Sequence, residues 1–203
     1  MLRLTNVLQK SRKALEDFDL LKVLQAEIRH ELSSNPFPDS QCSSLGEFSL
    51  DYDSKKSQDV VFRKKCESGE EVAVSALLSP LAIEGDSSFP REAQMKVCIK
   101  KPGMSSILQF DCGVTPIGDY GSELSIQNAC YIPSANSLAF SMYKGPSFSS
   151  LDPDLQHELT KYLVSKGIKQ SFTNFLLHHL HLKEQGQYVN WLQRLEAIVS
   201  SED

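Results

Sequence analysis

The sequence contains very little of what marks an enzyme or a membrane protein. Across its 203 residues, no apolar run approaches the roughly 20 residues that a helix needs to cross a bilayer. A Walker loop, a GxGxxG turn, a GxSxG elbow and an HExxH helix are all absent from the sequence. We therefore expect no membrane insertion, no catalytic residues and no bound cofactor.

Basic residues are the minority among the charged ones. There are 21 lysines and arginines against 26 acidic residues, which leaves a formal charge of -5 at pH 7. Proteins that bind nucleic acid usually present a basic face, so nucleic acid is not expected as the main ligand. A mildly acidic chain is compatible with basic protein partners, although the charge alone does not identify them.

Cysteines are few and widely spaced, and no CxxC pair occurs. They are Cys42, Cys66, Cys98, Cys112 and Cys130. An odd number at such spacings, without a secretory signal peptide, favours reduced thiols in a non-secretory compartment. The last four lie in or next to strand-like runs, which favours burial as small apolar side chains.

The first 13 residues, MLRLTNVLQKSRK, contain no acidic residue. Arg3, Lys10, Arg12 and Lys13 alternate with apolar residues there, which is the composition of a mitochondrial presequence. The alternative is that this stretch forms the basic first turns of a helix. We therefore expect residues 1–12 to be a presequence remnant or a helix start, and residues 13–203 to form a single domain.

The C-terminal run from Leu151 to Val199 predicts two helices separated by Gly167. Asp152 before Pro153 is a typical N-cap followed by proline at the first helical position. The second helix has Gly186 as its candidate point of interruption, and its second half has a heptad-like apolar seam. The apolar positions of this second helix are Phe172, Phe175, Leu176, Leu180, Tyr188, Leu192, Leu195 and Val199, with Trp191 and Ile198 beside them.

Another amphipathic helix is predicted near the start of the chain, from Lys13 to Leu32, and it ends before Pro36 and Pro38. Each terminal helix has one apolar stripe that must be covered. We therefore expect the two helices to pair with each other or with a neighbouring subunit. The residues expected at this packing surface are Leu24, Ile28, Trp191, Leu192, Leu195 and Val199.

The middle of the chain has the alternating pattern of β-strands, broken by short turns. Short links between successive strands favour an antiparallel meander, with one buried and one wetter face. The expected class is therefore α+β: a twisted antiparallel sheet of about seven strands, flanked by an N-terminal helix and two C-terminal helices. The expected strands are Leu45–Tyr52, Asp59–Cys66, Glu71–Leu78, Ala93–Lys100, Ser106–Val114, Glu123–Ile132 and Leu138–Tyr143.

Two small clusters are candidate sites for chemistry. His178 and His181 lie at i and i+3 of the last helix, but zinc usually takes four well-placed ligands, so we interpret this stretch as exposed polar helix surface and expect no metal. Asp51 and Asp53 lie near a strand end without an apolar pocket signature, and we interpret them as solvated carboxylates.

Several segments taken together resemble the mitochondrial glycoprotein family. The C-terminal segments are LDPDLQHELTKYLVSKGI, FTNFLL and YVNWLQRLEAIV. The upstream segments are KVLQAEIRHELSS, GEFSLDY, EVAVSALLSPLA and MKVCIKKPGMSSILQFDCGV, and the last ends in the pattern of Leu108, Phe110, Asp111 and Cys112. The resemblance extends from Leu20 to Val199.

This resemblance implies a highly twisted seven-stranded antiparallel sheet with paired terminal helices, assembled as a ring-shaped homotrimer. It also implies a non-enzymatic, multi-ligand acidic protein of the mitochondrial matrix, linked to oxidative phosphorylation, mitochondrial translation and chaperone-like support of basic partners. Members that bind basic ligands have long acid-rich loops. The corresponding loops here, IEGDSSFPRE and TPIGDYGSE, are short and only mildly acidic, so strong charge-driven binding is not expected.

The leading hypothesis from the sequence is therefore a non-catalytic homotrimeric scaffold of the mitochondrial matrix that binds basic protein partners. The alternative is a helix-grip carrier, in which a curved antiparallel sheet and a long C-terminal helix enclose a small molecule.

Overall fold

The computed structural model describes residues 2–34, 44–80, 91–118, 121–134 and 143–200, with side chains in the first helix described from Phe18 onward. The chain forms two compact units. One consists of Asp39–Leu182 and contains the sheet. The other consists of Met1–Pro38 together with Lys183–Asp203 and contains a pair of helices.

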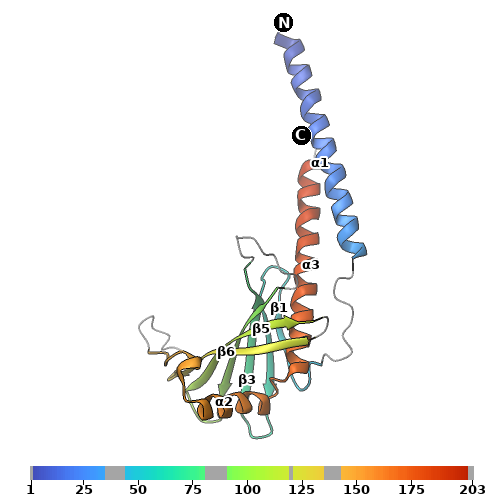
Figure 1. Cartoon of the computed structure of the whole chain (residues 1–203). Helices are drawn as coiled ribbons and strands as arrows, with labels where there is room; N and C mark the ends of the chain where they lie inside the picture. Colours follow the sequence, from blue (N-terminus) through green and yellow to red (C-terminus); the bar gives the residue numbers. More distant parts are fainter. Residues whose placement is uncertain (1, 35–43, 81–90, 119–120, 135–142, 201–203) are drawn as a thin grey trace. The chain divides into compact units, whose positions relative to one another are not determined.

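Among the described residues, the sheet is an antiparallel meander of six strands, and every strand pairs with its neighbours in the sequence (Figure 1). This confirms the α+β class and the predicted strand order. The expected strand at 138–143 lies almost entirely outside the described residues. The strands are β1 (Ser49–Asp53), β2 (Val60–Lys65), β3 (Glu71–Leu78), β4 (Ala93–Lys100), β5 (Ile107–Ile117) and β6 (Gly121–Ile132).

The first strand begins later than its sequence pattern predicts. A turn occupies the positions after Leu45, where the amide of Phe48 donates to the Leu45 carbonyl at 3.3 Å. Gly46 has a φ of +63° in this turn, a conformation that glycine adopts without steric cost. Pairing with β2 therefore starts only at Ser49.

Alternation along the strands gives the sheet one buried face, as the period-2 pattern predicts. In β4, Ala93, Met95, Val97 and Ile99 are buried, while the residues between them are exposed or half-buried. We call the side that carries these buried residues the inner face. Aromatic residues pack on it near the β1 edge of the sheet, where the rings of Phe48 and Phe172 have centroids 4.5 Å apart.

Two helical segments cover the inner face. They are α2 (Pro153–Ser165) and the first part of α3 (Gln170–Ser200), which contribute Leu163, Phe172, Leu176 and Leu180 to the same buried cluster as the strands. A short 3-10 turn, η1 (Phe148–Ser150), precedes α2. The predicted interruption of α3 at Gly186 is wrong, because the helix is continuous through that residue.

Both ends of α2 are closed by the residues that the sequence predicts. The Asp152 carboxylate accepts hydrogen bonds from the amides of Asp154 and Leu155 at 2.9 and 3.4 Å, which satisfies donors that lack helical partners. At the other end, the amide of Gly167 donates to Val164 and that of Ile168 to Leu163, the two bonds of a Schellman motif.

The second unit is built from α1 (Leu2–Ser33) and the part of α3 that begins at Lys183. The helix α1 starts at Leu2, well before the expected position, Lys13. The basic stretch before Lys13 contains neither glycine nor proline, so no residue in it interrupts the helix. Whether residues 1–12 also serve as a targeting segment stays a prediction. Within the described residues, no helix is both long and apolar enough to span a membrane.

Candidate functional site

The helix-pair unit has a small apolar core of its own. Leu24 and Ile28 of α1 are buried against Leu192 of α3, and Leu195 and Val199 pack on this cluster while remaining partly exposed. The sequence pattern therefore named five residues that the structure brings together. Because each helix contributes only two or three side chains, this core is small for a free-standing unit.

Polar contacts hold the two helices in an antiparallel register, which Figure 1 shows as α1 and the end of α3 running in opposite directions. The Gln25 amide donates to Glu196 Oε1 at 3.0 Å. Nearer the other end of the pair, the Gln185 amide donates to the backbone carbonyls of Glu31 and Ser34 at 3.0 and 3.3 Å. The latter carbonyls lie at the C-terminus of α1, where the helix leaves acceptors without internal partners.

A third contact joins the sides of the two helices. The Tyr188 hydroxyl donates to Glu27 Oε1 at 3.3 Å. Partial burial raises the pKa of Tyr188, and the adjacent Glu27 carboxylate raises it further, so the phenol stays protonated as a donor. Residues 20, 23 and 27 form one stripe of α1, and residues 188, 191, 195 and 198 form one stripe of α3. The hydrogen bond between Tyr188 and Glu27 therefore places both stripes on the same side of the helix pair.

That side of the helix pair is apolar and exposed. Val23 is 65% exposed, Trp191 53% and Ile198 70%, although side chains of these types are usually covered. We call this surface the apolar strip. It consists of Leu20, Val23, Tyr188, Trp191 and Ile198, all exposed and all on the two joined stripes.

Trp191 was expected among the residues that pack the helix pair, and the structure places it elsewhere. It lies outside the buried cluster and stacks on Tyr188, with ring centroids 5.9 Å apart and planes inclined by 19°. One residue along a helix corresponds to a rotation of about 100°, so Trp191 and Leu192 cannot both face the same partner helix. The indole therefore belongs to the apolar strip.

The histidines of α3 differ from one another in their surroundings. The interpretation of this stretch as exposed surface is wrong for His181, which is buried and donates from Nε2 to the Arg91 carbonyl at 3.1 Å. Burial lowers the pKa of His181 to about 4. No group of three or more metal-ligating side chains occurs in the part of the chain that the structure describes.

The two carboxylates at the end of β1 have separate side-chain partners and are not simply solvated, as the sequence suggested. Asp51 Oδ2 lies 2.6 Å from Arg63 Nε, and Asp53 Oδ2 lies 2.9 Å from His179 Nε2. The hydrogen bond that Arg63 donates to Asp51 raises the pKa of Arg63 above its ordinary value. Because they pair with different groups, the two carboxylates do not form an acid–base couple.

The class of protein follows from this fold. The crystal structure of the Trypanosoma brucei p22 protein has a similar fold, with a TM-score of 0.70 and 20% identity over 92% of this chain and 100% of that one. A Leishmania major protein described as a sequence homologue of human p32 has a TM-score of 0.71 and 19% identity, covering 91% and 99%. These likenesses define the fold.

The family itself follows from the sequence. The model of the family described as Mitochondrial glycoprotein matches residues 24–199, so the chain belongs to the mitochondrial glycoprotein family, as the resemblance predicts. An uncharacterized mitochondrial protein of Arabidopsis thaliana is 25% identical over 191 residues, 89% of this chain and 74% of that protein. The mitochondrial acidic protein mam33 of Schizosaccharomyces pombe is 41% identical over 57 residues, 28% of this chain and 21% of that protein.

Proposed function

We propose that the chain is a non-catalytic, homotrimeric, multi-ligand scaffold of the mitochondrial matrix that supports oxidative phosphorylation or mitochondrial translation by binding protein partners in a chaperone-like way. The apolar strip carries this proposal, because it is the surface that an assembly of identical chains would cover. Membership of the mitochondrial glycoprotein family supports it.

The strip has the composition of a subunit interface. Aromatic residues are enriched at interfaces, and Tyr188 and Trp191 stack at its centre as one rigid apolar surface. Two further aliphatic side chains, Val23 and Ile198, extend it along both helices. Because the cluster around Leu192 is small, burial of the strip against other copies would add to the stability of the helix pair.

The proposed compartment and partners rest on other observations. The relatives in Arabidopsis and fission yeast are both named as mitochondrial proteins. The basic, acid-free start of the chain is compatible with import. The formal charge of -5 favours basic protein partners over nucleic acid.

The helix-grip carrier is less compatible with the packing of the inner face. Such a carrier holds its ligand between the sheet and the long helix. Here that space is occupied by Phe62 and Phe110 from the sheet and by Phe172 and Leu176 from α3, all of them fully buried. A ligand could enter there only by displacing the main core of the protein.

Light scattering on the full chain after size exclusion tests the assembly. The proposal expects three times the 22.7 kDa of one chain at micromolar concentration. A mass of one chain at that concentration contradicts it. Partners are then sought by affinity capture from isolated mitochondria, with protease protection of the organelles to place the protein in the matrix.

A further inference from the structure

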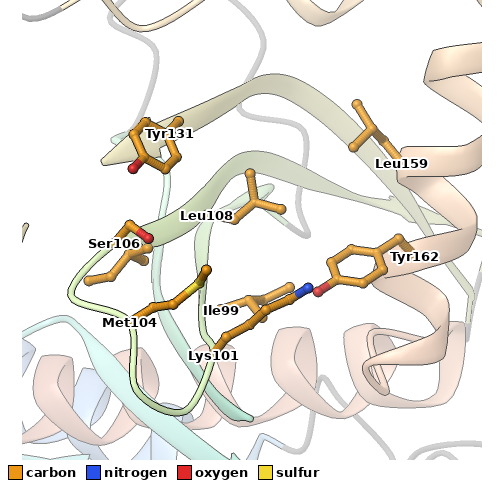
Figure 2. Close-up of a pocket in the computed structure, with 9 residues that line it drawn as sticks. Ile99, Lys101, Met104, Ser106, Leu108, Tyr131, Leu159 and Tyr162 are labelled. Carbon is orange, nitrogen blue, oxygen red and sulfur yellow. The ribbon is translucent and has the colours of Figure 1, made fainter. Parts of the chain in front are cut away.

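A groove of about 490 Å³ lies at one end of the inner face of the sheet (Figure 2). Its walls come from the β4–β5 hairpin, from β6 and from α2. The hairpin turn is closed by the amide of Met104, which donates to the Lys101 carbonyl at 3.2 Å, with Gly103 at a φ of +75°. Every residue of the groove belongs to the sheet unit.

The groove exists because α2 covers only part of this row of the sheet. Ile99, Leu108 and Tyr131 face one another across β4, β5 and β6. Ile99 is 2% exposed, Leu108 is half-buried and Tyr131 is 64% exposed. Leu159 and Tyr162 of α2 line the groove opposite this row. An apolar surface that is continuous with the protein core is therefore open to solvent at the β6 side.

Polar groups gather at one end of this apolar surface. Figure 2 shows the amino end of Lys101 and the hydroxyl of Tyr162 pointing toward each other. Lys166 Nζ lies 4.9 Å from the centroid of the Tyr162 ring, and Lys166 is itself ion-paired with Glu70. These contacts fix the position of the ring. Burial raises the pKa of Tyr162, so its hydroxyl stays protonated and able to donate.

The charge balance at this end is positive. Two ammonium groups, those of Lys166 and Lys101, face the single Glu70 carboxylate, which is ion-paired with Lys166 and whose pKa is lowered by both. An ammonium and a phenol hydroxyl that point toward the same end of a groove can each donate to an oxygen of one carboxylate. A volume of about 490 Å³ lies within the range of about 300–1,000 Å³ that is typical of small-molecule sites.

We propose that this groove binds an amphipathic organic anion, a single carboxylate on an unbranched alkyl chain, with the chain along Leu108 and Met104 and the carboxylate at Lys101 and Tyr162. The site is separate from the filled space between the sheet and α3 that a helix-grip carrier would use. It is also independent of the proposed assembly, because its residues lie outside the apolar strip.

Calorimetric titration of the full chain with dodecanoate, below its micellar concentration, tests the proposal, with dodecanol as the uncharged probe. We expect one saturable site per chain and about tenfold weaker binding of dodecanol, since the alcohol lacks the charge-assisted bonds. Lys101→Gln should weaken dodecanoate binding about fivefold. Lys100→Gln removes the same charge from the neighbouring exposed position outside the groove and should change binding less than twofold.

A second pair of variants tests the position of the alkyl chain. Met104→Asp places a carboxylate in the groove and should abolish dodecanoate binding. Ile117→Asp makes the same change at the far end of β5, where the exposed fraction is nearly equal, 52% against 54%, and should leave binding intact. Both positions are exposed, so the two variants should fold. The mass measured by light scattering should stay that of the wild type in all of these variants.

Three results would overturn the proposal. The first is the absence of saturable binding by the wild type up to millimolar dodecanoate. The second is equal affinity for dodecanol and dodecanoate, which indicates an apolar groove without preference for an anion and favours an apolar peptide side chain as its occupant. The third is binding that survives Met104→Asp.

Discussion

The ammonium of Lys166 is ion-paired with the carboxylate of Glu70, and the two side chains are only 15% and 10% exposed. Lys166 is the C-cap of α2, and Glu70 ends the turn between β2 and β3. Ser68 in that turn also donates to Glu70 Oε2, at 3.1 Å. This pair therefore fixes the end of α2 to the sheet, directly behind the Tyr162 wall of the groove.

Replacing Glu70 should destabilise the sheet unit. Glu70→Gln leaves the Lys166 charge largely buried without its partner, and we expect a loss of about 2 kcal/mol in the free energy of unfolding. Urea denaturation followed by circular dichroism measures this loss. The matched control is Glu67→Gln in the same turn, where the side chain is exposed and the change should stay within about 0.5 kcal/mol. Equal effects of the two substitutions would contradict the assignment.

The contribution of this pair should also depend on pH in a defined direction. The hydrogen bond from Lys166 holds the pKa of Glu70 below its ordinary value of 4.5, so the stabilisation is complete above that value and is lost as the pH falls through the lowered pKa. The same bond raises the pKa of Lys166 above 10.5, so at alkaline pH the stabilisation is lost only beyond that value. The difference between wild type and Glu70→Gln should therefore be constant from about pH 5.5 to 9 and shrink in acid. A difference that persists unchanged at pH 2 would rule this out.

Two glycines should respond to alanine in opposite directions. Gly167 has a φ of +100°, and an added Cβ would lie 3.1 Å from Phe48 Cε2, so Gly167→Ala should lower the free energy of unfolding by about 1–2 kcal/mol. Gly186 lies inside α3, and apart from the adjacent helix backbone nothing lies within 4 Å of an added Cβ, so Gly186→Ala should raise the free energy of unfolding by about 0.5–1 kcal/mol. Chemical denaturation of both variants measures the two shifts. A stabilised Gly167→Ala variant would show that the Schellman end of α2 is not constrained as described.

Substitutions in the apolar strip and in the buried cluster of the helix pair should have different effects. Leu195→Asp places a charge beside Leu192 and should both release the C-terminal helix and break the assembly. Trp191→Glu, at an exposed position, should break the assembly while the monomer keeps its helical content. Light scattering and circular dichroism distinguish the two outcomes.

The matched control for the strip is Gln193→Glu, an exposed position about 200° around α3 from Trp191 and therefore on the opposite side from the strip, which should keep the wild-type mass. A Trp191→Glu protein that keeps the wild-type mass would refute the strip as the subunit interface. Loss of assembly in the control as well would show that general charge on the helix pair, not the strip, determines the mass.

His181 should make the protein sensitive to mild acid. Burial is the main cause that lowers its pKa to about 4, with the charges of Arg91 and His178 adding to the effect, while the ordinary value is 6.5. Between these two values the unfolded chain binds more protons than the folded one, so stability should fall as the pH drops from about 6.5 toward 4, by up to about 3 kcal/mol. His181→Gln keeps a donor for the Arg91 carbonyl and should flatten the profile between pH 7 and 5. An unchanged profile would contradict the assignment.

Most of the local structure of this chain could be predicted from its sequence. Alternation in β4, the cap formed by Asp152 and the glycine after α2 depend on neighbours within a few residues, so residue type and spacing were sufficient to predict them. The helix-pair residues Leu24, Ile28 and Leu192 were also identified by spacing alone. The interruption predicted at Gly186 was wrong, because the strong apolar stripe on both sides of it outweighs the cost of one glycine in a helix.

The class of fold, the order of the elements and membership of the family follow from the sequence alone, because periodicity and motif order are properties of the linear chain. Four features depend instead on tertiary packing: the burial of His181, the exposure of Trp191, the pairing of Glu70 with Lys166, and the groove that α2 leaves beside Tyr131. Each of these depends on the rotation of a helix or on a contact between residues far apart in sequence. Such contacts are determined by tertiary packing and cannot be predicted from a local sequence pattern.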